Sequence, residues 1–384
     1  MERRTIIISA ALFIIGILIG ALGVYLLAPI TQGPLVEAVK PVIYIQIRDP
    51  GDFNHLVLME GAKRFAEMKG LIFESFVHHG DVDAAMKALD EIVTKYGPNR
   101  VGFVSVPHDM GHFKAIADYC EEKGVYWAAW YGLYEGFPLD DYPHLVWSGQ
   151  SPAYEEGYAT AKALVEAMGG KGNIVFLGGG VGVPCWQFRV LGMLDYIETV
   201  PEVNILDGGF VGLTQEEAMS VMETYIAKYG DQIDGVWGVF IAPSIGALKA
   251  CEKHGLAVPI STIDVTPEIL DYIINGKEGE PRICATWDNN SYWCGMSAAA
   301  AVYKAIVEGW SPPYELKAFH WKGYIVDKSN AEIVKQTKYS YPWPDYATDK
   351  YIFGPDNCFV ERNRYNLELL PTPEQMEKLE PWMK

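Results

Sequence analysis

Polar side chains and aromatic rings gather directly after the expected β-strands of this chain. The set comprises Asp49, Asp52, Phe53, Asn54, His108, Asp109, Trp130, Tyr131, Trp186, Gln187, Arg189, Phe240, Asp264, Asp288 and Asn289. Carboxylates accept hydrogen bonds from hydroxyl groups, amides and guanidinium groups supply donors, and flat rings pack against C–H faces. A single Asp or Asn after a strand often only caps a helix or closes a turn. As a set, these residues predict a binding site for a small polyhydroxylated molecule such as a sugar.

The sequence contains no complete motif of a dinucleotide-binding, metal-binding or hydrolase site. The run Gly178–Gly182 follows an expected strand, but no register of it gives the GxGxxG pattern of a dinucleotide-binding turn, so we interpret it as a tight strand-to-helix turn. His108 and His112 are four residues apart without a third metal ligand in view. The sequence has no GxSxG nucleophile elbow. It therefore favours reversible binding without catalytic residues, cofactor or metal.

The elements that must position these residues alternate along the chain from Pro41. Apolar β-branched runs predict strands at 42–47, 71–77, 101–106, 125–130, 173–177, 203–207, 235–240, 259–263 and 283–286. Helical spacing predicts helices at 55–69, 83–96, 111–123, 154–168, 184–199, 214–229, 244–254 and 293–308, with a short helix from Pro267. This order predicts an α/β protein with two doubly wound parallel sheets, the second starting near residue 150.

Open parallel sheets bind ligands beyond the carboxyl ends of their strands, where loops and helix N-termini converge. Two such lobes that face each other would line one cleft from both sides. Because the candidate residues follow strands in both halves, we expect them to meet in that cleft.

The N-terminus has the composition of a membrane segment. An uncharged run from Thr5 to Pro29 follows Arg3 and Arg4 and is long enough to cross a bilayer core of about 30 Å. The arginines predict that the rest of the chain lies outside the cytoplasm. We expect an uncleaved anchor at 1–29 and a linker at 30–40, although a cleavage site near Ala21–Gly23 would instead give a secreted or periplasmic protein. The first cysteine is Cys120, which excludes a lipid-bearing cysteine next to this run.

The net charge limits the kinds of partner that the chain can bind, and the cysteine spacing predicts the state of its thiols. Asp and Glu outnumber Lys and Arg by 49 to 31, which gives a formal net charge of −18 and argues against a nucleic-acid polymer as partner. The six cysteines form no CxxC pair or zinc pattern, so we expect mostly buried free thiols.

Four segments together resemble the type 1 periplasmic binding proteins of sugar ABC transporters, the ribose- and galactose-binding type. They are Ser244–Ala250, Asp264–Pro267, Ala285–Asn289 and Gly323–Asn330, and the resemblance covers about residues 41–335. It implies two lobes joined by a hinge with three crossings, near Ser148–Gln150, Asp288–Asn290 and Ser311–Lys317. The first lobe would contain 41–148 and 290–312, and the second 149–289 and 318–335.

The resemblance also implies an extracytoplasmic, non-enzymatic, monomeric substrate-binding protein that delivers a sugar to an ABC permease. Asp264 would accept sugar hydroxyls, Asn289 would be the cleft amide near the hinge, and Phe53 would pack on the sugar ring. Trp130–Tyr131 stands where ribose-binding members have an Asp-Arg pair, and Phe240–Ile241 replaces an Asn-Asp pair. A binding site with more aromatic rings and fewer charged groups predicts a pyranose, a substituted sugar or a nucleoside rather than ribose as the ligand.

Two alternatives share this fold: an extracellular ligand-sensing domain and a nucleoside-binding protein. Residues 336–384 extend beyond the family's usual length. Their proline-rich stretches, Tyr341–Pro344 and Pro371–Pro373, predict an extended tail over one lobe.

Overall fold

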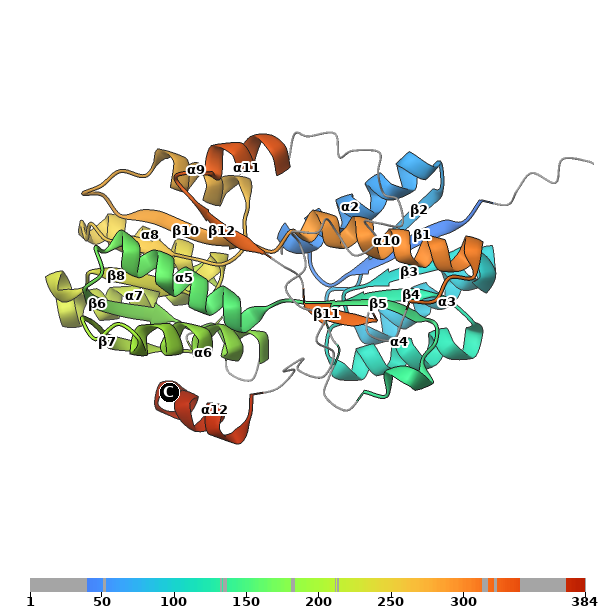
Figure 1. The fold of residues 1–384 in the computed structure, drawn as a ribbon, viewed down its shortest axis with the longest axis horizontal. Coiled ribbons are helices and arrows are strands. Elements are labelled where there is room, and N and C mark those ends of the chain that lie inside the picture. Colours follow the sequence, from blue (N-terminus) through green and yellow to red (C-terminus); the bar gives the residue numbers. More distant parts are fainter. Residues whose placement is uncertain are drawn as a thin grey trace, which may run out of the picture. The chain divides into compact units, whose positions relative to one another are not determined.

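The computed structural model describes residues 40–50, 53–131, 133, 137–180, 184–210, 212, 214–312, 317–320, 323–338 and 371–383. Within these ranges the strands form two six-stranded sheets, each covered by helices on both faces (Figure 1). The predicted two-lobe α/β fold is confirmed. The expected N-terminal anchor lies outside the described residues, and within the described part no helix has both the length and the apolarity to cross a bilayer.

The first sheet has the strand order β11-β5-β4-β3-β1-β2 and is parallel throughout. Its strands are β1 (Val42–Ile47), β2 (Ile72–Val77), β3 (Val101–Ser105), β4 (Trp127–Trp130), β5 (Leu145–Gln150) and β11 (Ala318–His320). Along β1, Ile43, Ile45 and Ile47 enter one core while Tyr44 enters the other, as expected for a strand buried on both faces. The chain order reverses between β1 and β3. In open parallel sheets, ligands bind beyond the carboxyl ends of the strands at such a switch point.

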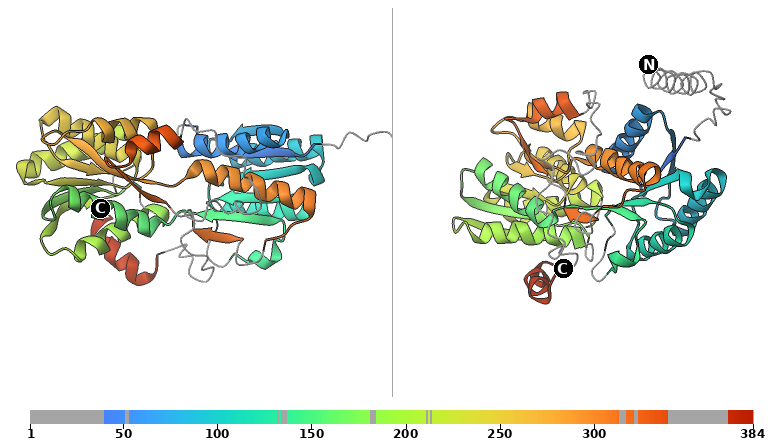
Figure 2. Two further views of the ribbon diagram at one scale, coloured as in Figure 1. Left: turned by 45° about the horizontal axis from the view of Figure 1, so that its top comes forward. Right: turned by 45° about the vertical axis from the view of Figure 1, so that its right-hand side comes forward.

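Four helices cover the first sheet: α2 (Phe53–Lys69), α3 (Val82–Tyr96), α4 (Met110–Lys123) and α10 (Ser291–Glu308). Helices α2 and α10 lie side by side on one face (Figure 2), and α3 and α4 pack on the other. Glycines bring α2 and α10 close together. A Cβ on Gly61 would lie 2.0 Å from the Tyr292 carbonyl oxygen, and one on Gly295 would lie 1.9 Å from that of Leu58.

The second sheet has the order β12-β10-β9-β8-β6-β7, with β12 antiparallel to β10 and the other pairs parallel. Its strands are β6 (Gly172–Leu177), β7 (Val203–Gly209), β8 (Gly235–Gly238), β9 (Pro259–Ser261), β10 (Arg282–Asp288) and β12 (Tyr324–Asp327). Its reversal point lies between β6 and β8, in the same relation as β1 and β3 in the first sheet.

One face of the second sheet is covered by α5 (Ala153–Ala167) and α6 (Pro184–Glu198). The other face is covered by α7 (Gln215–Tyr229), α8 (Ile241–His254), α9 (Pro267–Asn275) and α11 (Ala331–Lys338). The expected capping box of Thr214 and Glu217 starts α7, and Thr266 caps α9 with Pro267 in its first turn. Short 3-10 turns lie at Pro98–Arg100, Leu139–Asp141, Gly230–Gln232 and Glu380–Trp382.

Helix α12 (Pro373–Leu379), which the sequence analysis did not predict as a helix, packs on α6. Leu379 is fully buried, and the Trp382 ring meets the edge of Phe176 at a centroid distance of 5.1 Å. Lys378 forms ion pairs with Asp195 and Glu198 of α6. The described end of the C-terminal extension therefore lies on the second lobe.

The chain passes between the sheets three times: from β5 to α5, from β10 to α10, and from β11 to β12. The second crossing follows Asp288 at the end of β10. The first follows Gln150, so residues 149–150 lie in β5 of the first sheet and not in the second lobe. The third falls between His320 and Tyr324, not within Ser311–Lys317, because the three-residue strand β11 extends the first sheet by pairing with β5. Residues 318–320 thus lie in the first sheet and not in the second lobe.

The second and third crossings touch each other at Gly323. A Cβ there would lie 2.2 Å from Trp287 Nε1 and 2.4 Å from the Asp288 carbonyl oxygen. The antiparallel pairing of β10 and β12 extends to Asp288 and Tyr324, and the Tyr324 hydroxyl donates to Asp288 Oδ2 at 3.0 Å. These two crossings therefore leave the second lobe as one paired ribbon.

Candidate ligand-binding site

Strained backbone marks the carboxyl edges of both sheets. Among the described residues, four non-glycine residues have positive φ: His79 (49°), Tyr131 (66°), Asp264 (81°) and Asn290 (52°). Each of them follows a strand, namely β2, β4, β9 and β10 in turn. Side chains rarely adopt this conformation unless the surrounding structure imposes it, and such residues cluster at ligand sites. The edge that sequence analysis selected is therefore also the edge where backbone strain gathers.

A buried ion pair forms the centre of the second-lobe edge. Arg189 on α6 donates from Nε to Glu156 Oε2 on α5 at 2.5 Å and from Nη1 to the Val239 carbonyl oxygen at 3.1 Å. The Glu156 side chain is fully buried, and its other oxygen accepts from Ser151. Burial alone would lower the pKa of the Arg189 guanidinium, but Glu156 and Asp264 raise it above its ordinary value. The guanidinium is thus permanently charged and held by the protein itself.

The close approach of α5 and α6 makes this pair possible. A Cβ on Gly157 would lie 1.8 Å from the carbonyl oxygen of Arg189, and one on Gly192 would lie 1.9 Å from that of Tyr154. Because only glycine allows this distance, the residue before Gly157 comes within reach of the Arg189 side chain. Sequence analysis missed Glu156; the signal available was an acidic residue next to a glycine inside an apolar helix.

Asp264 is held on three sides after β9. Its Oδ1 accepts from Asn289 Nδ2 at 2.8 Å and lies 3.8 Å from Arg189 Nη2. Its backbone carbonyl accepts from the Thr286 hydroxyl at 2.7 Å, and its amide donates to the Trp287 carbonyl at 2.9 Å. The residue is 8% exposed, so its carboxylate has a fixed direction before any ligand arrives.

Asn289 carries an unmet hydrogen-bonding group at the same place. The residue is 4% exposed, and its Oδ1 has no hydrogen-bond partner among the described residues. A buried polar atom without a partner is costly, and such atoms in native structures call for an explanation such as a ligand or water.

Tyr131 links this network to the first lobe. It follows β4, and its phenol lies close enough to the second-lobe network for the charges of Glu156, Arg189 and Asp264 to act on it. Burial is the main cause that raises its pKa well above the ordinary value, and the two carboxylates add to the rise. Burial also raises the pKa of the Cys185 thiol to about 11. The positive charges of Arg189 and, to a smaller extent, of Arg48 in the first lobe act in the opposite direction. The charges of the second-lobe network therefore influence groups at the carboxyl edge of the first sheet.

Aromatic rings occupy both edges. Trp186 of α6 stacks on Phe240 with a centroid distance of 5.2 Å and an interplanar angle of 8°. In the first lobe the Trp130 and Tyr131 rings are 4.6 Å apart, and His55 meets the Trp130 ring edge-on at 6.0 Å. Trp130 is only 2% exposed and belongs to the α2–α10 core, while Tyr131 packs against that core and stays half-buried.

The structure places the other predicted residues as follows. Asp109 caps α4 by accepting from the His112 amide at 2.8 Å, and both His108 and Asp109 are exposed. Asp288 is fully buried and accepts from Tyr324 and the Asn290 amide, and Gln187 is buried on α6. Asp49 is exposed after β1, while Phe53 and Asn54 start α2, where Asn54 Oδ1 accepts from Ser291 at 2.9 Å. Asp52 lies outside the described residues.

A group of histidines lies at the ends of β2 and β3. The rings of His78 and His112 meet edge-on at 5.2 Å, and His112 Nδ1 accepts from the His108 amide at 3.1 Å. Burial lowers the pKa of His112 to about 4 and also lowers that of His78. Over the described residues, no group of three His, Cys, Asp or Glu side chains is arranged to hold a metal.

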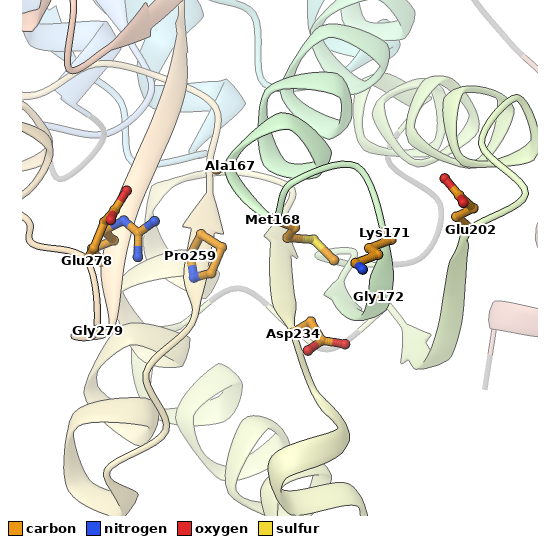
Figure 3. A pocket seen from close by; sticks show the side chains of 10 residues that line it. Ala167, Met168, Lys171, Gly172, Glu202, Asp234, Pro259, Glu278 and Gly279 are labelled. Carbon is orange, nitrogen blue, oxygen red and sulfur yellow. The ribbon is translucent and has the colours of Figure 1, made fainter.

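A separate surface pocket of about 660 Å³ lies at the opposite edge of the second sheet (Figure 3). Gly172 and Arg282, the first residues of β6 and β10, line it, together with the charged side chains of Lys171, Asp234 and Glu278. These residues precede strands and none belongs to the predicted site. The pocket is therefore distinct from the carboxyl-edge cluster.

Comparison with known proteins points to one family. Residues 145–309 match the family model described as a periplasmic binding protein domain. A xylitol-binding protein of Mycolicibacterium smegmatis is 29% identical over 168 residues, which cover 44% of this chain and 46% of that protein. The match therefore spans about half the length of the curated relative.

Solved structures share the fold over more of the chain. A twin-arginine translocation pathway signal protein from Burkholderia phytofirmans has a TM-score of 0.70 at 21% identity, covering 79% of this chain and 95% of that one. An ABC transporter periplasmic solute-binding protein from Actinobacillus succinogenes, solved with bound D-allose, has a TM-score of 0.67 at 21% identity, covering 77% and 100%. One from Bacillus halodurans with bound myo-inositol has a TM-score of 0.64 at 18% identity, covering 77% and 97%.

These identities support a likeness of fold, and the two sheets with three crossings agree with it. The chain thus has the two-lobe periplasmic binding protein fold, and its residues 145–309 match the model of that family's domain.

Proposed function

We propose that this protein is the extracytoplasmic substrate-binding component of an ABC-type importer and binds a sugar or related polyol between its lobes. The observation that carries the proposal is the Asp264 carboxylate. It is buried, fixed by a hydrogen bond from Asn289, and 3.8 Å from Arg189 Nη2. A fixed carboxylate is a strong acceptor for the hydroxyl groups of a polyol.

The surrounding groups suit the rest of such a ligand. Asn289 Oδ1 offers a second acceptor, and the half-buried rings of Trp186, Phe240 and Tyr131 offer flat apolar surfaces. Rings and acceptors together match the alternating C–H faces and hydroxyl groups of a sugar. The bound D-allose and myo-inositol of two fold relatives, and the xylitol of the sequence relative, are all polyhydroxylated molecules, which supports the same ligand class here.

The cluster supports binding without chemistry. Its acidic and basic groups are engaged with each other, and the contacts of the described residues around Arg189 include no nucleophile–base pair. Closure would follow from ligand contacts to both lobes, with the three crossings absorbing the rotation. The closed form would then be the one that a permease recognises.

We further propose that residues 1–29 anchor the protein in the cytoplasmic membrane with the body outside. The uncharged run after Arg3 and Arg4 supports this location. Cell fractionation should find the protein with the membranes, and added protease should digest it in cells whose membrane is intact. Recovery of a shortened chain in the soluble extracytoplasmic fraction would show cleavage instead.

Ligand binding is tested with the full-length protein in mild detergent, by thermal shift and calorimetry against xylitol, D-allose, myo-inositol and two nucleosides. A ligand at 100 times its Kd stabilises the folded state by about 2.7 kcal/mol, which gives a clear shift. We expect at least one polyol to bind with a stoichiometry of one. Binding of nucleosides alone would favour the nucleoside-binding alternative, and the absence of any shift would contradict the proposal.

A further inference from the structure

Two of the three guanidinium nitrogens of Arg189 already donate hydrogen bonds within the protein. Its Nε bonds Glu156, its Nη1 bonds the Val239 carbonyl, and its Nη2 lies 3.8 Å from Asp264. An arginine recognises a ligand carboxylate through two parallel N–H groups on one edge. Glu156 occupies the Nε position of such an edge, so Arg189 is poorly placed to receive an acidic ligand.

The charges around Arg189 leave an excess of negative charge. Among the described residues, the carboxylates paired with the Arg189 guanidinium are two, Glu156 and Asp264. Arg48, half-buried in the first lobe, lowers the pKa of Cys185 and is the last of the causes that act on it. Buried carboxylates repel an entering anion more strongly than exposed ones, because little water screens them.

The ion pair is not needed to pack the two helices. In the first lobe, Gly295 lies against the carbonyl of Leu58 in the way that Gly157 lies against that of Arg189. Leu58 thus occupies the position of Arg189, and Cys294, which precedes Gly295, occupies that of Glu156. Both are fully buried, and the crossing forms without charge. A buried ion pair is weak evidence for stability, so the charges in the second lobe have another use.

We propose that Glu156 is a positioning and specificity residue: by holding Arg189 it keeps the site net negative, so that the site accepts uncharged sugars and polyols and rejects their acid forms. This inference rests on the proposed function and specifies its ligand class. Glu156 acts through Arg189 and Asp264 and needs no contact with the ligand itself.

The test compares each neutral ligand with its acid: xylitol with xylonate, and D-allose with allonate, by calorimetry at pH 7 on the full-length protein. We expect the wild-type protein to bind each acid about 100-fold more weakly than its neutral partner. In Glu156→Gln the neutral ligand should bind about tenfold more weakly, while the ratio between neutral and acid ligand falls by at least about tenfold.

The matched control is Glu166→Gln on the same helix, whose side chain is 66% exposed and should leave both affinities unchanged. If Glu156 had only a structural role, Glu156→Gln would lower the affinities for both ligands by the same factor. The ratio of the two affinities would then be unchanged, which would overturn the inference. If Glu156→Gln does not fold, Glu156→Asp keeps the charge and must keep the ratio; a changed ratio contradicts the inference. If the wild-type protein binds neutral and acid ligands equally well, this inference is wrong but the proposed function stands. If it binds neither, the proposed function is contradicted as well.

Discussion

The two lobes repeat one helix crossing and give it different chemistry. Gly61 and Gly295 bring α2 and α10 together in the first lobe, and Gly192 and Gly157 bring α6 and α5 together in the second. At the matched positions the first lobe has Leu58 and Cys294, while the second has Arg189 and Glu156. The glycines determine how closely the helices approach, and the residues beside them decide whether the crossing is only packed or also charged.

The carboxyl edges differ in the same sense. At the first-lobe edge the half-buried Tyr131 ring packs on the buried Trp130, and the buried His112 ring meets His78. The second-lobe edge presents the fixed charges of Glu156, Arg189 and Asp264. A ligand that bridges the two would meet apolar faces on one side and oriented acceptors on the other. The proposed site would then combine two complementary halves of one repeated fold.

Breaking the charged crossing should have the largest effect. Arg189→Leu leaves the Glu156 carboxylate buried without its cation and should lower the free energy of unfolding by about 3–5 kcal/mol. The double change Arg189→Leu with Glu156→Cys copies the first-lobe pair and should recover most of that loss, because a packed apolar pair can replace a buried ion pair. Urea denaturation measures both. A double variant as unstable as the single one would show that the crossings are not equivalent.

The second largest effect should come from acidification, which should destabilise the first lobe more than the second. Burial lowers the pKa of His112 to about 4 and lowers that of His78, so the unfolded chain binds more protons than the folded chain between pH 6.5 and pH 4. This stabilisation is complete above pH 6.5 and is lost as pH falls towards 4. For His112 it amounts to roughly 3 kcal/mol at most. Hydrogen exchange should show the loss in the first lobe, and His112→Gln should reduce it; an equal loss in the second lobe would contradict the assignment.

Neutralising the fixed acceptor should affect binding more than folding. Asp264→Asn keeps the shape of the side chain but removes the charge, and we expect a loss of ligand affinity of about 1.5–3 kcal/mol. Calorimetry with the polyol that binds the wild type measures it. Asp231→Asn, an exposed change in the same lobe, is the control and should have no effect. Unchanged affinity in Asp264→Asn would place the site elsewhere.

The tail contact should give the smallest effect. Lys378 pairs with Asp195 and Glu198, but its side chain is 26% exposed and Glu198 is 69% exposed. Lys378→Ala should therefore cost less than about 1 kcal/mol in unfolding free energy, and the cost should shrink further in high salt. Thermal denaturation of the second lobe at two salt concentrations measures it. A larger, salt-independent loss would mean that the packing of α12 depends on this side chain.

Sequence patterns predicted the lobes because their strands and helices are long and strongly periodic. The first strand was predicted at its observed bounds, Val42–Ile47, and the caps at Thr214 and Thr266 followed from local chemistry. Strand β11 was missed because three residues are too few to show a period, and this displaced the expected third crossing.

The site was harder to predict because side-chain roles depend on neighbours from distant segments. Position after a strand selected Asp264, which the structure places 3.8 Å from Arg189 Nη2. The same rule selected Asp109, which the structure uses to cap α4. It could not select Glu156, which lies inside a helix and reaches Arg189 only because Gly157 lets two helix backbones nearly touch.

The tight contact at Gly323 has a mechanical consequence. Because Gly323 lies against Trp287 and Asp288 without room for a methyl group, we expect these two connections to move together when the lobes rotate. The link from β5 to α5 would then be the connection that bends independently. Pulled apart in a force experiment, the lobes should first stretch at that link, and a bulky residue at 323 should soften the whole joint.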